Sequence, residues 1–432
     1  MSICVLTACS APAASPAPAS APRPAAADPD GEDDGGVAVG PGLAALASAP
    51  AATFERVAPP AGAHPLVCDL APIAGRLAAT FSAMPIDLDG AQVHLLDPAT
   101  GAWTLALDWD RGGAPDRTRE VGGQGITRIR VIDGRLWATD SDAPRWGGFG
   151  WSGAPMEDYL FVSEPDGRFP PLSPDDAPPA STRVLPFAFH CFDVIRYRGA
   201  RVATGGTEAR GGGRGTRYPG GLFVGAPEDR ELPPRFEVAG AGPVGVVRTT
   251  YLHRFRGRLY MGLQNNERRI RWDLAVLDGD PRAPATAPPA LVRVTADGGW
   301  LTRRFASGGG RLYWIGARPD RSDAALYASD DGDHFRRIAL PADAGAPQDL
   351  LLAGDTRWLV AAGGLYRAGA DDRFARIAPA PDGDPFGRWD AFCSAPLAAA
   401  DDALWAGSTR DGALWRVRAP SDQSRLPSAP QR

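Results

Sequence analysis

A short phrase recurs seven times along the chain, and its period limits the folds open to it. In each copy a two-residue turn precedes a short apolar run, as in Asp133-Gly134-Arg135-Leu136-Trp137. Asp-Gly and Gly-Gly pairs between apolar runs predict β-hairpin turns. Successive copies are 59, 66, 57, 53, 46 and 46 residues apart. The aligned apolar residues are Leu77, Leu136, Val202, Leu259, Leu312, Trp358 and Leu404.

Periods of about 40 to 50 residues are typical of β-propeller blades, and longer spacings fit loop insertions. Each turn is expected to join a first and a second strand. A third strand follows in every copy, and a fourth strand follows in most of them. The fourth strands are predicted at Trp103–Asp108, Arg168–Leu172, Arg235–Val238, Ala290–Val294, His334–Ile338 and Arg373–Ile377.

The seventh copy ends after its third strand, and a candidate for its fourth strand lies near the other end of the chain. Thr53–Pro59 resembles His334–Leu340 and Arg373–Pro379 in sequence. A ring of blades must close, because an open ring leaves unpaired sheet edges. We therefore predict an all-β fold, a seven-bladed β-propeller of four-stranded antiparallel blades over residues 53–420. A two-sheet sandwich is the alternative, but it does not readily use seven equivalent units.

The N-terminal residues predict the location of the protein. Leu6-Thr7-Ala8-Cys9 resembles the lipobox of bacterial lipoproteins, a family in which the cysteine is lipidated after cleavage just before it. The resemblance implies lipidation of Cys9 and a lipid anchor in the bacterial cell envelope. Only eight residues precede Cys9 and none is basic, although a signal peptide needs a basic start. We expect the true start codon to lie upstream.

Residues 1–9 are thus expected to be the remnant of a signal, and residues 10–52 a disordered spacer. The spacer is rich in Ala and Pro and includes the acidic patch Asp28–Asp34, a composition that cannot bury enough surface to fold. Residues 421–432 are expected to be a disordered tail. No stretch approaches the roughly 20 apolar residues of a membrane helix, so the lipid is the only membrane contact predicted.

The composition excludes some functions. The formal net charge is −5, whereas a general nucleic-acid binder is basic. All 46 basic residues are Arg. Cys68, Cys191 and Cys393 remain beyond the N-terminal pair, and no Cys/His spacing indicates a metal site. Cys68 and Cys393 belong to neighbouring blades, but the sequence leaves open whether they pair. We predict a monomer without metal or cofactor.

Long loops between second and third strands are predicted in blades two, three and four, at Asp140–Asp158, Gly205–Gly220 and Gln264–Trp272. Arg and aromatic side chains together suit sugars or anions, so we expect these loops to bind a ligand. The alternative is that the aromatic rings pack on the blade beneath them. The candidate binding residues are Trp146, Trp151, Arg210, Arg214, Arg217, Tyr218, His253, Arg268, Arg271 and Trp272.

Two segments resemble a short motif of a known family. Ser329–Phe335 and, in degenerate form, Ser163–Phe169 resemble the Asp-box of sialidase-like propellers. In that family the box is a structural hairpin remote from the catalytic centre. The Gly205-Gly206 pair resembles kelch repeats. The resemblance supports the fold, and a sialidase-like enzyme would also need clustered arginines and a tyrosine nucleophile.

We therefore expect an envelope lipoprotein whose propeller binds a glycan, an anionic envelope component or a partner protein. The alternative is a sialidase-like glycoside hydrolase or a lyase acting at the channel mouth. Polar residues expected on the innermost strands would supply its chemistry, although they can equally line a wet channel. They are Arg128, Arg130, Asp193, His253, Arg254 and Arg304.

Overall fold

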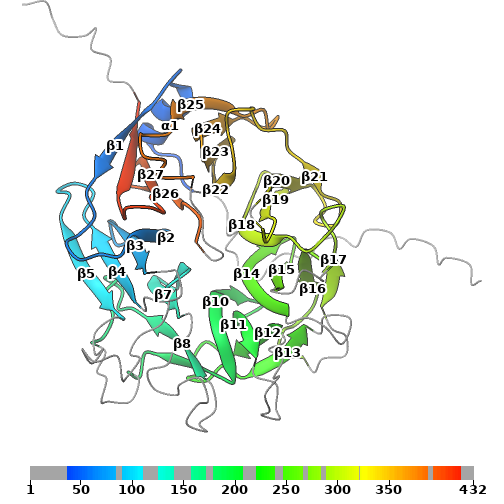
Figure 1. Ribbon diagram of the computed structural model, residues 1–432. Helices are drawn as coiled ribbons and strands as arrows, with labels where there is room; N and C mark the ends of the chain where they lie inside the picture. Colours follow the sequence, from blue (N-terminus) through cyan, green and yellow to red (C-terminus); the bar gives the residue numbers. More distant parts are fainter. Residues whose placement is uncertain are drawn as a thin grey trace, which may run out of the picture.

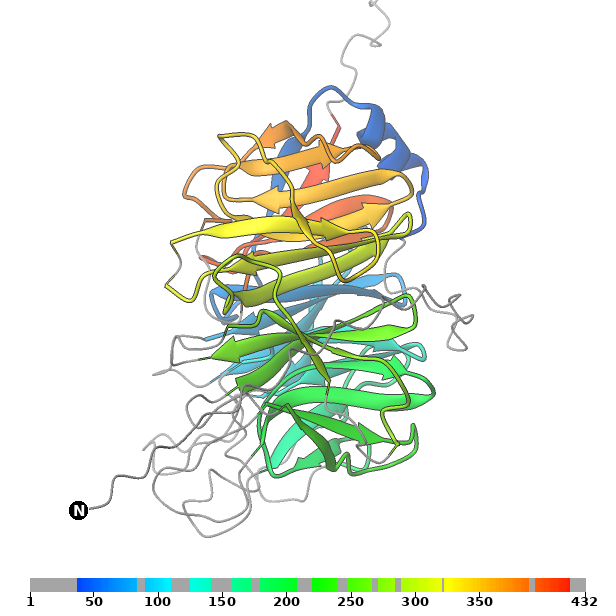
Figure 2. The ribbon, with the colours of Figure 1, turned by 90° about the vertical axis from the view of Figure 1, so that its right-hand side faces the viewer.

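The computed structural model is a ring of seven β-sheets around a central axis (Figure 1), and Figure 2 shows the ring from its edge. Each sheet has four antiparallel strands, and each first strand lies next to the axis. The all-β, seven-bladed prediction is confirmed. The structure describes residues 37–83, 90–109, 125–140, 157–171, 179–207, 220–238, 247–265, 271–283, 289–320, 322–387 and 393–419.

In the first four blades the strands follow chain order outward from the axis. Blade one contains β2 (Leu66–Ile73), β3 (Arg76–Ser82), β4 (Ala91–Leu96) and β5 (Trp103–Asp108). Blade two contains β6 (Ile129–Ile132), β7 (Arg135–Thr139), β8 (Glu157–Val162) and β9 (Arg183–Pro186). Blade three contains β10 (Ala188–Tyr197), β11 (Ala200–Thr207), β12 (Gly220–Gly225) and β13 (Pro234–Val238). Blade four contains β14 (Val247–Phe255), β15 (Arg258–Asn265), β16 (Leu274–Leu277) and β17 (Ala290–Val292).

The last three blades complete the ring. Blade five contains β18 (Leu301–Gly308), β19 (Arg311–Ala317), β20 (Ala324–Ser329) and β21 (Arg336–Arg337). Blade six contains β22 (Pro347–Ala353), β23 (Thr356–Ala361), β24 (Gly364–Ala368) and β25 (Ala375–Pro379). Blade seven contains β26 (Leu397–Ala400), β27 (Ala403–Gly407), β28 (Leu414–Arg418) and, from the other end of the chain, β1 (Thr53–Val57).

Closure of the ring by the N-terminal strand is confirmed. β1 pairs antiparallel with β28, with Phe54 opposite Val417 and Arg56 opposite Trp415. The ring of Phe54 also lies 5.3 Å from that of Phe386. A disulfide joins Cys68 of β2 to Cys393, which precedes β26, and so ties blade one to blade seven.

The core of the protein lies between the blades. Within the described residues, one apolar cluster fills each of the seven junctions between neighbouring sheets. At the junction of blades seven and one, for example, Trp405 packs with Val67 and Leu77. Stability therefore comes from contacts between neighbours, as in other repeat architectures.

The ring has two faces. The turn face carries the turns between first and second strands, and the loop face carries the connections from second to third strands and between blades. The turns need backbone with positive φ, as at Asp133 (φ 51°) and Gly134 (φ 70°), which fits the two-residue hairpin expected from the sequence.

The predicted fourth strand of blade two, Arg168–Leu172, is wrong. The strand in that position is β9, Arg183–Pro186. Phe169 instead packs into the cluster between blades one and two, and its amide donates to the carbonyl of Ala106. The next two residues, Pro170 and Pro171, have no amide hydrogen to give to a sheet.

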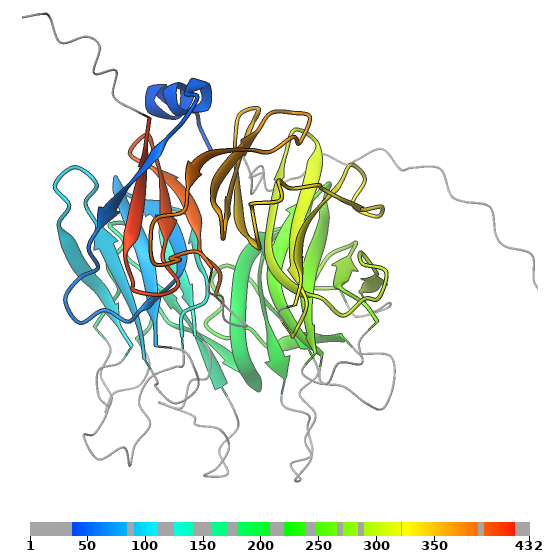
Figure 3. The same ribbon diagram turned by 45° about the horizontal axis from the view of Figure 1, so that its top comes forward.

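The spacer predicted over 10–52 also needs correction, because its last part is ordered on the ring. Helix α1 (Pro41–Ser48) lies at the end of blades six and seven (Figure 3), with Leu43 and Leu46 buried against them. Before it, Val37 forms a parallel bridge with Ala353 beside the channel. In the described part of the chain, no helix is long and apolar enough to cross a membrane.

Candidate functional site

The central channel is lined by charged side chains at equivalent places in the repeat. In six blades the residue five positions before the first turn is Asp69, Arg128, Asp193, Tyr251, Arg304 or Asp349. All six are nine-tenths or more buried. Five of the first strands carry a register irregularity at or just before this residue, which is typical of a β-bulge. A bulge re-aims the side chain next to it.

Arg304 reaches across the channel to two carboxylates. Its Nη1 lies 3.0 Å from Oδ1 of Asp69, and its Nε lies 3.4 Å from Oδ2 of Asp349. Its Nη2 also donates to the carbonyl oxygen of Cys68 at 2.9 Å. One guanidinium of blade five thus joins blades one and six through the interior of the ring.

Arg130 forms a second cluster with blades three and four. Its Nε and Nη2 donate to the two carboxylate oxygens of Asp193 at 2.9 and 2.8 Å. Nη2 also donates to the carbonyl of Leu252 at 2.9 Å. The two-point geometry is the strong form of the Arg–carboxylate pair.

Each of the three aspartates also accepts a backbone amide from the next blade. Asp69 accepts from Ile129 at 2.9 Å, Asp193 from Leu252 at 2.8 Å, and Asp349 from Leu397 at 2.8 Å. The repetition shows that these acids connect one blade to the next. Burial raises the pKa of all three carboxyl groups, and it raises that of Asp349 to about 6 against the lowering effect of Arg304.

A cavity of about 460 Å³ opens from this channel on the turn face. Its polar wall includes Asp69, Arg128, Arg130, His253 and Asp349, and its mouth carries an apolar collar. The collar is made by Val37, Pro72, Val131 and Leu351. We call this space the turn-face cavity.

The structure separates the predicted binding residues that it describes. His253 is buried in the wall of the turn-face cavity, where its ring stacks on Phe305 at 5.8 Å. Arg271 and Trp272 precede β16 and therefore lie at the loop-face end of blade four. His253 does not form one site with them.

Arg271 is exposed, while Trp272 packs against the core between blades three and four with the guanidinium of Arg293 over its ring at 5.5 Å. For Trp272 the structure therefore agrees with the alternative prediction, in which the aromatic rings of these loops pack on the blade beneath them. The other candidates lie outside the described residues: Cys9, Trp146, Trp151, Arg210, Arg214, Arg217, Tyr218 and Arg268.

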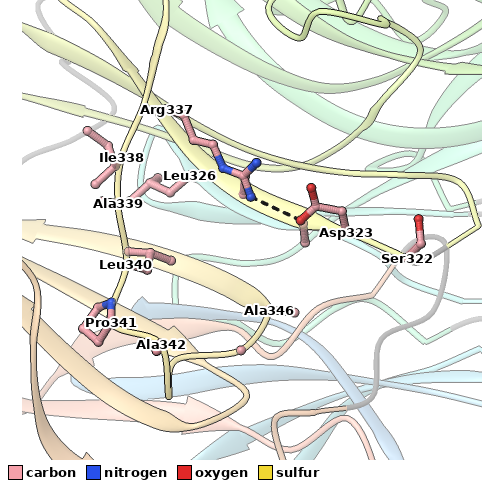
Figure 4. Close-up of a pocket in the computed structure, with 13 residues that line it drawn as sticks. Ser322, Asp323, Leu326, Arg337, Ile338, Ala339, Leu340, Pro341, Ala342 and Ala346 are labelled. Atoms are coloured by element: carbon pink, nitrogen blue, oxygen red, sulfur yellow. Dashed lines mark hydrogen bonds and ion pairs between the residues drawn. The ribbon is translucent and has the colours of Figure 1, made fainter.

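A second cavity, of about 650 Å³, lies on blade five (Figure 4). It forms where β21 ends after two residues and the chain turns away from the edge of β20. Arg337 and Asp323 form an ion pair of 3.3 Å beside it. The sequence does not indicate this cavity, because its pattern predicts a full fourth strand to Ile338.

The hairpin after β20 has a self-contained hydrogen-bond network. Asp331 Oδ1 accepts the amides of Asp333 and His334, both at 2.8 Å, and the hydroxyl of Ser329 at 2.9 Å. Burial acts to raise the pKa of Asp331, but these bonds hold it below its usual value. Ser329 accepts the amide of Gly332 at 2.8 Å. The network stabilises a tight turn far from the channel.

Sequence reasoning named Arg128, Arg130, Asp193 and Arg304 but missed Asp69 and Asp349 as their partners. Their position five residues before each turn would have identified both. Among the described residues, no group of three His, Cys, Asp or Glu side chains could hold a metal ion.

Comparisons with known proteins extend only to the fold. No family model matches the sequence, and no curated protein matches it. The structure is similar to a catalytically inactive virginiamycin B lyase from Staphylococcus aureus, with TM-score 0.51 and 8% identity over 84% of this chain and 98% of that chain. It is also similar to the GH74 xyloglucanase from Xanthomonas campestris, with TM-score 0.51 and 16% identity. That match covers 86% of this chain and 54% of the xyloglucanase.

Proposed function

We propose that this chain is a cell-envelope lipoprotein whose propeller binds a ligand at its loop face. The observation that carries the proposal is the pairing of the channel carboxylates. Asp69, Asp193 and Asp349 each hold a guanidinium and a backbone amide of the next blade. Carboxylates committed in this way maintain the ring, and no described pair of them remains for the acid–base work of a glycosidase.

The binding surface would be the rim formed by the long loops of blades two to four. The sequence places Trp146, Trp151 and seven other candidates in these loops, and one of them, Arg271, is exposed at the loop-face end of blade four. Guanidinium groups grip carboxylates and phosphates in a fork geometry. The ligand class is therefore a glycan, an anionic envelope component or an acidic partner protein.

Substitution of two rim arginines tests the binding proposal. Arg268→Ala with Arg271→Ala is expected to reduce retention of an anionic glycan or envelope fraction at least tenfold, because each lost fork contact costs about 1 kcal/mol or more. The matched control is Arg168→Ala with Arg373→Ala, whose side chains are 62% and 89% exposed at turns on the other face. Equal retention by both double variants would reject the rim.

The lipid anchor is proposed from the lipobox-like Leu6–Cys9 and the Ala/Pro-rich residues after it. Expressed from its own locus together with the sequence upstream of Met1, the protein should incorporate radioactive palmitate in bacterial cells, and Cys9→Ala should abolish the label. Absence of label on the wild type, or label that survives the substitution, would rule out this anchor.

The second candidate function is a hydrolase or lyase at the channel mouth. The observation that favours it is Tyr251, which is buried in the channel with the guanidinium of Arg128 at 5.6 Å from its ring. We interpret the Ser329–Phe335 hairpin as an Asp-box, in line with a sialidase-like ancestry. Tyr251→Phe separates the two functions: loss of glycoside cleavage without loss of binding at the rim would favour the enzyme.

A further inference from the structure

Arg128 is a buried arginine whose Nε makes no hydrogen bond to any described residue, and its guanidinium lies 5.6 Å from the ring centre of Tyr251. Arg128 is 9% exposed. Its Nε lies 3.5 Å from Oδ2 of Asp69 and 4.0 Å from Oδ2 of Asp193, and it forms a hydrogen bond with neither. Arg130, two residues on, makes three hydrogen bonds to the same region. Buried guanidinium donors are normally satisfied, so Arg128 points to an acceptor supplied from outside.

The turn-face cavity offers space for such a group beside Arg128. Its volume of about 460 Å³ lies within the usual range for small-molecule sites, about 300 to 1,000 Å³. The collar at its mouth is apolar, and Val131 is 41% exposed there. A solvent-exposed valine above a buried arginine suits a ligand with a charged head and an apolar body.

We propose that the turn-face cavity binds a small amphiphilic organic anion, with its carboxylate or similar oxyanion head on Arg128 and its apolar body against the collar. Oxyanions accept the charge-assisted hydrogen bond that the Nε of Arg128 leaves unmade. A ligand with a cationic head would be repelled by the guanidinium groups of Arg128 and Arg130, which both line the turn-face cavity. The site lies on the face opposite the proposed rim and does not depend on that proposal.

Charge in the cavity predicts how pH affects binding. Asp349 faces the cavity and is itself faced by Arg304 of β18 and Asp69 of β2. Its pKa is raised to about 6, chiefly by burial, so it becomes neutral as pH falls below that value. Protonation of Asp349 removes repulsion for an anion in the cavity. Binding is therefore expected to strengthen from pH 8 to pH 5.

The experiment compares three probes with one octyl chain: octane-1-sulfonate, octylammonium and octanol, each below its micelle concentration. Sulfonate remains ionised throughout this pH range, so any pH effect belongs to the protein. Calorimetric titration of the full chain should show one sulfonate site, with octylammonium at least tenfold weaker, a difference of about 1.4 kcal/mol. Equal binding of the two ions, or no sulfonate binding at 1 mM, would overturn the proposal.

Two substitutions locate the site. Arg128→Gln is expected to weaken sulfonate binding at least tenfold. Val131→Asp changes only the exposed collar and should weaken it about threefold, while Val131→Lys should strengthen it by a similar factor. Leu105→Asp, at another apolar residue that is 42% exposed on blade one, is the matched control. If Arg128→Gln does not fold, the two Val131 variants test the site instead. Changes in sulfonate affinity no larger than that caused by Leu105→Asp would refute it.

Discussion

Arginine side chains hold the blades of this propeller together on its turn face. Asp372, in the turn between β24 and β25, accepts from the hydroxyl of Tyr313 at 2.7 Å and is surrounded by three guanidinium groups. The nearest nitrogens of Arg311, Arg336 and Arg357 lie at 2.6, 2.8 and 3.0 Å. Arginine suits this role because its planar fork can bind several acceptors at once.

Another single residue, Asp349, makes the free energy of unfolding depend on pH. The folded-state pKa of about 6 lies above the ordinary value of 3.8. The stability contributed by this group is therefore complete below pH 3.8 and is lost as pH rises through 6, because the folded state then has to bury a charge. The change is of the order of 3 kcal/mol.

Asp349→Asn stays neutral at every pH and can still accept the amide of Leu397. We expect the destabilisation caused by this substitution to shrink by about 2 kcal/mol between pH 4.5 and pH 7.5. Urea unfolding of both proteins at several pH values measures it. Asp355→Asn, at an exposed turn residue of the same blade, should show no such trend. A loss that grows with pH would contradict the assignment.

Among the elements, α1 is held by a side chain far from it in sequence. The carboxylate of Asp402 accepts the amides of Gly42 and Leu43, the latter at 3.1 Å. At the other end Arg367 donates to the carbonyls of Leu46 and Ala49, at 3.0 and 2.8 Å. A helix of eight residues is too short to be stable alone. These caps and its two buried leucines therefore decide whether it forms.

Removal of the Asp402 cap tests this account. Asp402 has φ 55°, so Asp402→Gly deletes the carboxylate without backbone strain. We expect α1 to lose about 1 kcal/mol, seen as faster amide hydrogen exchange over residues 43–48. Asp401→Gly, at the preceding turn residue with φ 49°, is the control. Equal acceleration in both variants would show that the turn, and not the cap, stabilises α1.

These elements also show which strands and helices can be predicted from the sequence. The second strands were predictable because their turns need residues that accept positive φ, as at Asp133 and Gly134. The outer strand of blade two was not predictable, because an apolar residue such as Phe169 fits a strand and a core cluster equally well. Only its hydrogen bond to Ala106 of blade one shows that it lies outside the sheet of blade two. α1 escaped prediction for a related reason: its partners, Asp402 and Arg367, lie more than 300 residues away.

The site was predictable only in part. The polar residues expected on the innermost strands, His253 among them, indicated a channel, and the structure has charged side chains there. Their pairing depends on ring closure, which sets Arg304 of blade five against Asp69 of blade one. No local pattern reports a contact between residues 235 positions apart.

At the scale of the whole molecule, two links of different chemistry join the ends of the ring. β1 completes blade seven through five paired positions with β28. The Cys68–Cys393 disulfide connects two inner segments across a sequence separation of 325 residues. Both close very long loops, so each removes much of the freedom that the unfolded chain would have.

The disulfide makes ring stability sensitive to reductant. In the loop-entropy account a bridge of this span stabilises by about 6 kcal/mol. Wild type is therefore expected to unfold at a lower urea concentration under reducing conditions. Cys68→Ala with Cys393→Ala should be equally weakened with or without reductant. Cys191, the described free cysteine, is buried, and Cys191→Ala should keep the response to reductant. A wild type that is indifferent to reductant, while mass spectrometry detects the Cys68–Cys393 peptide pair, would show that β1 alone keeps the ring closed.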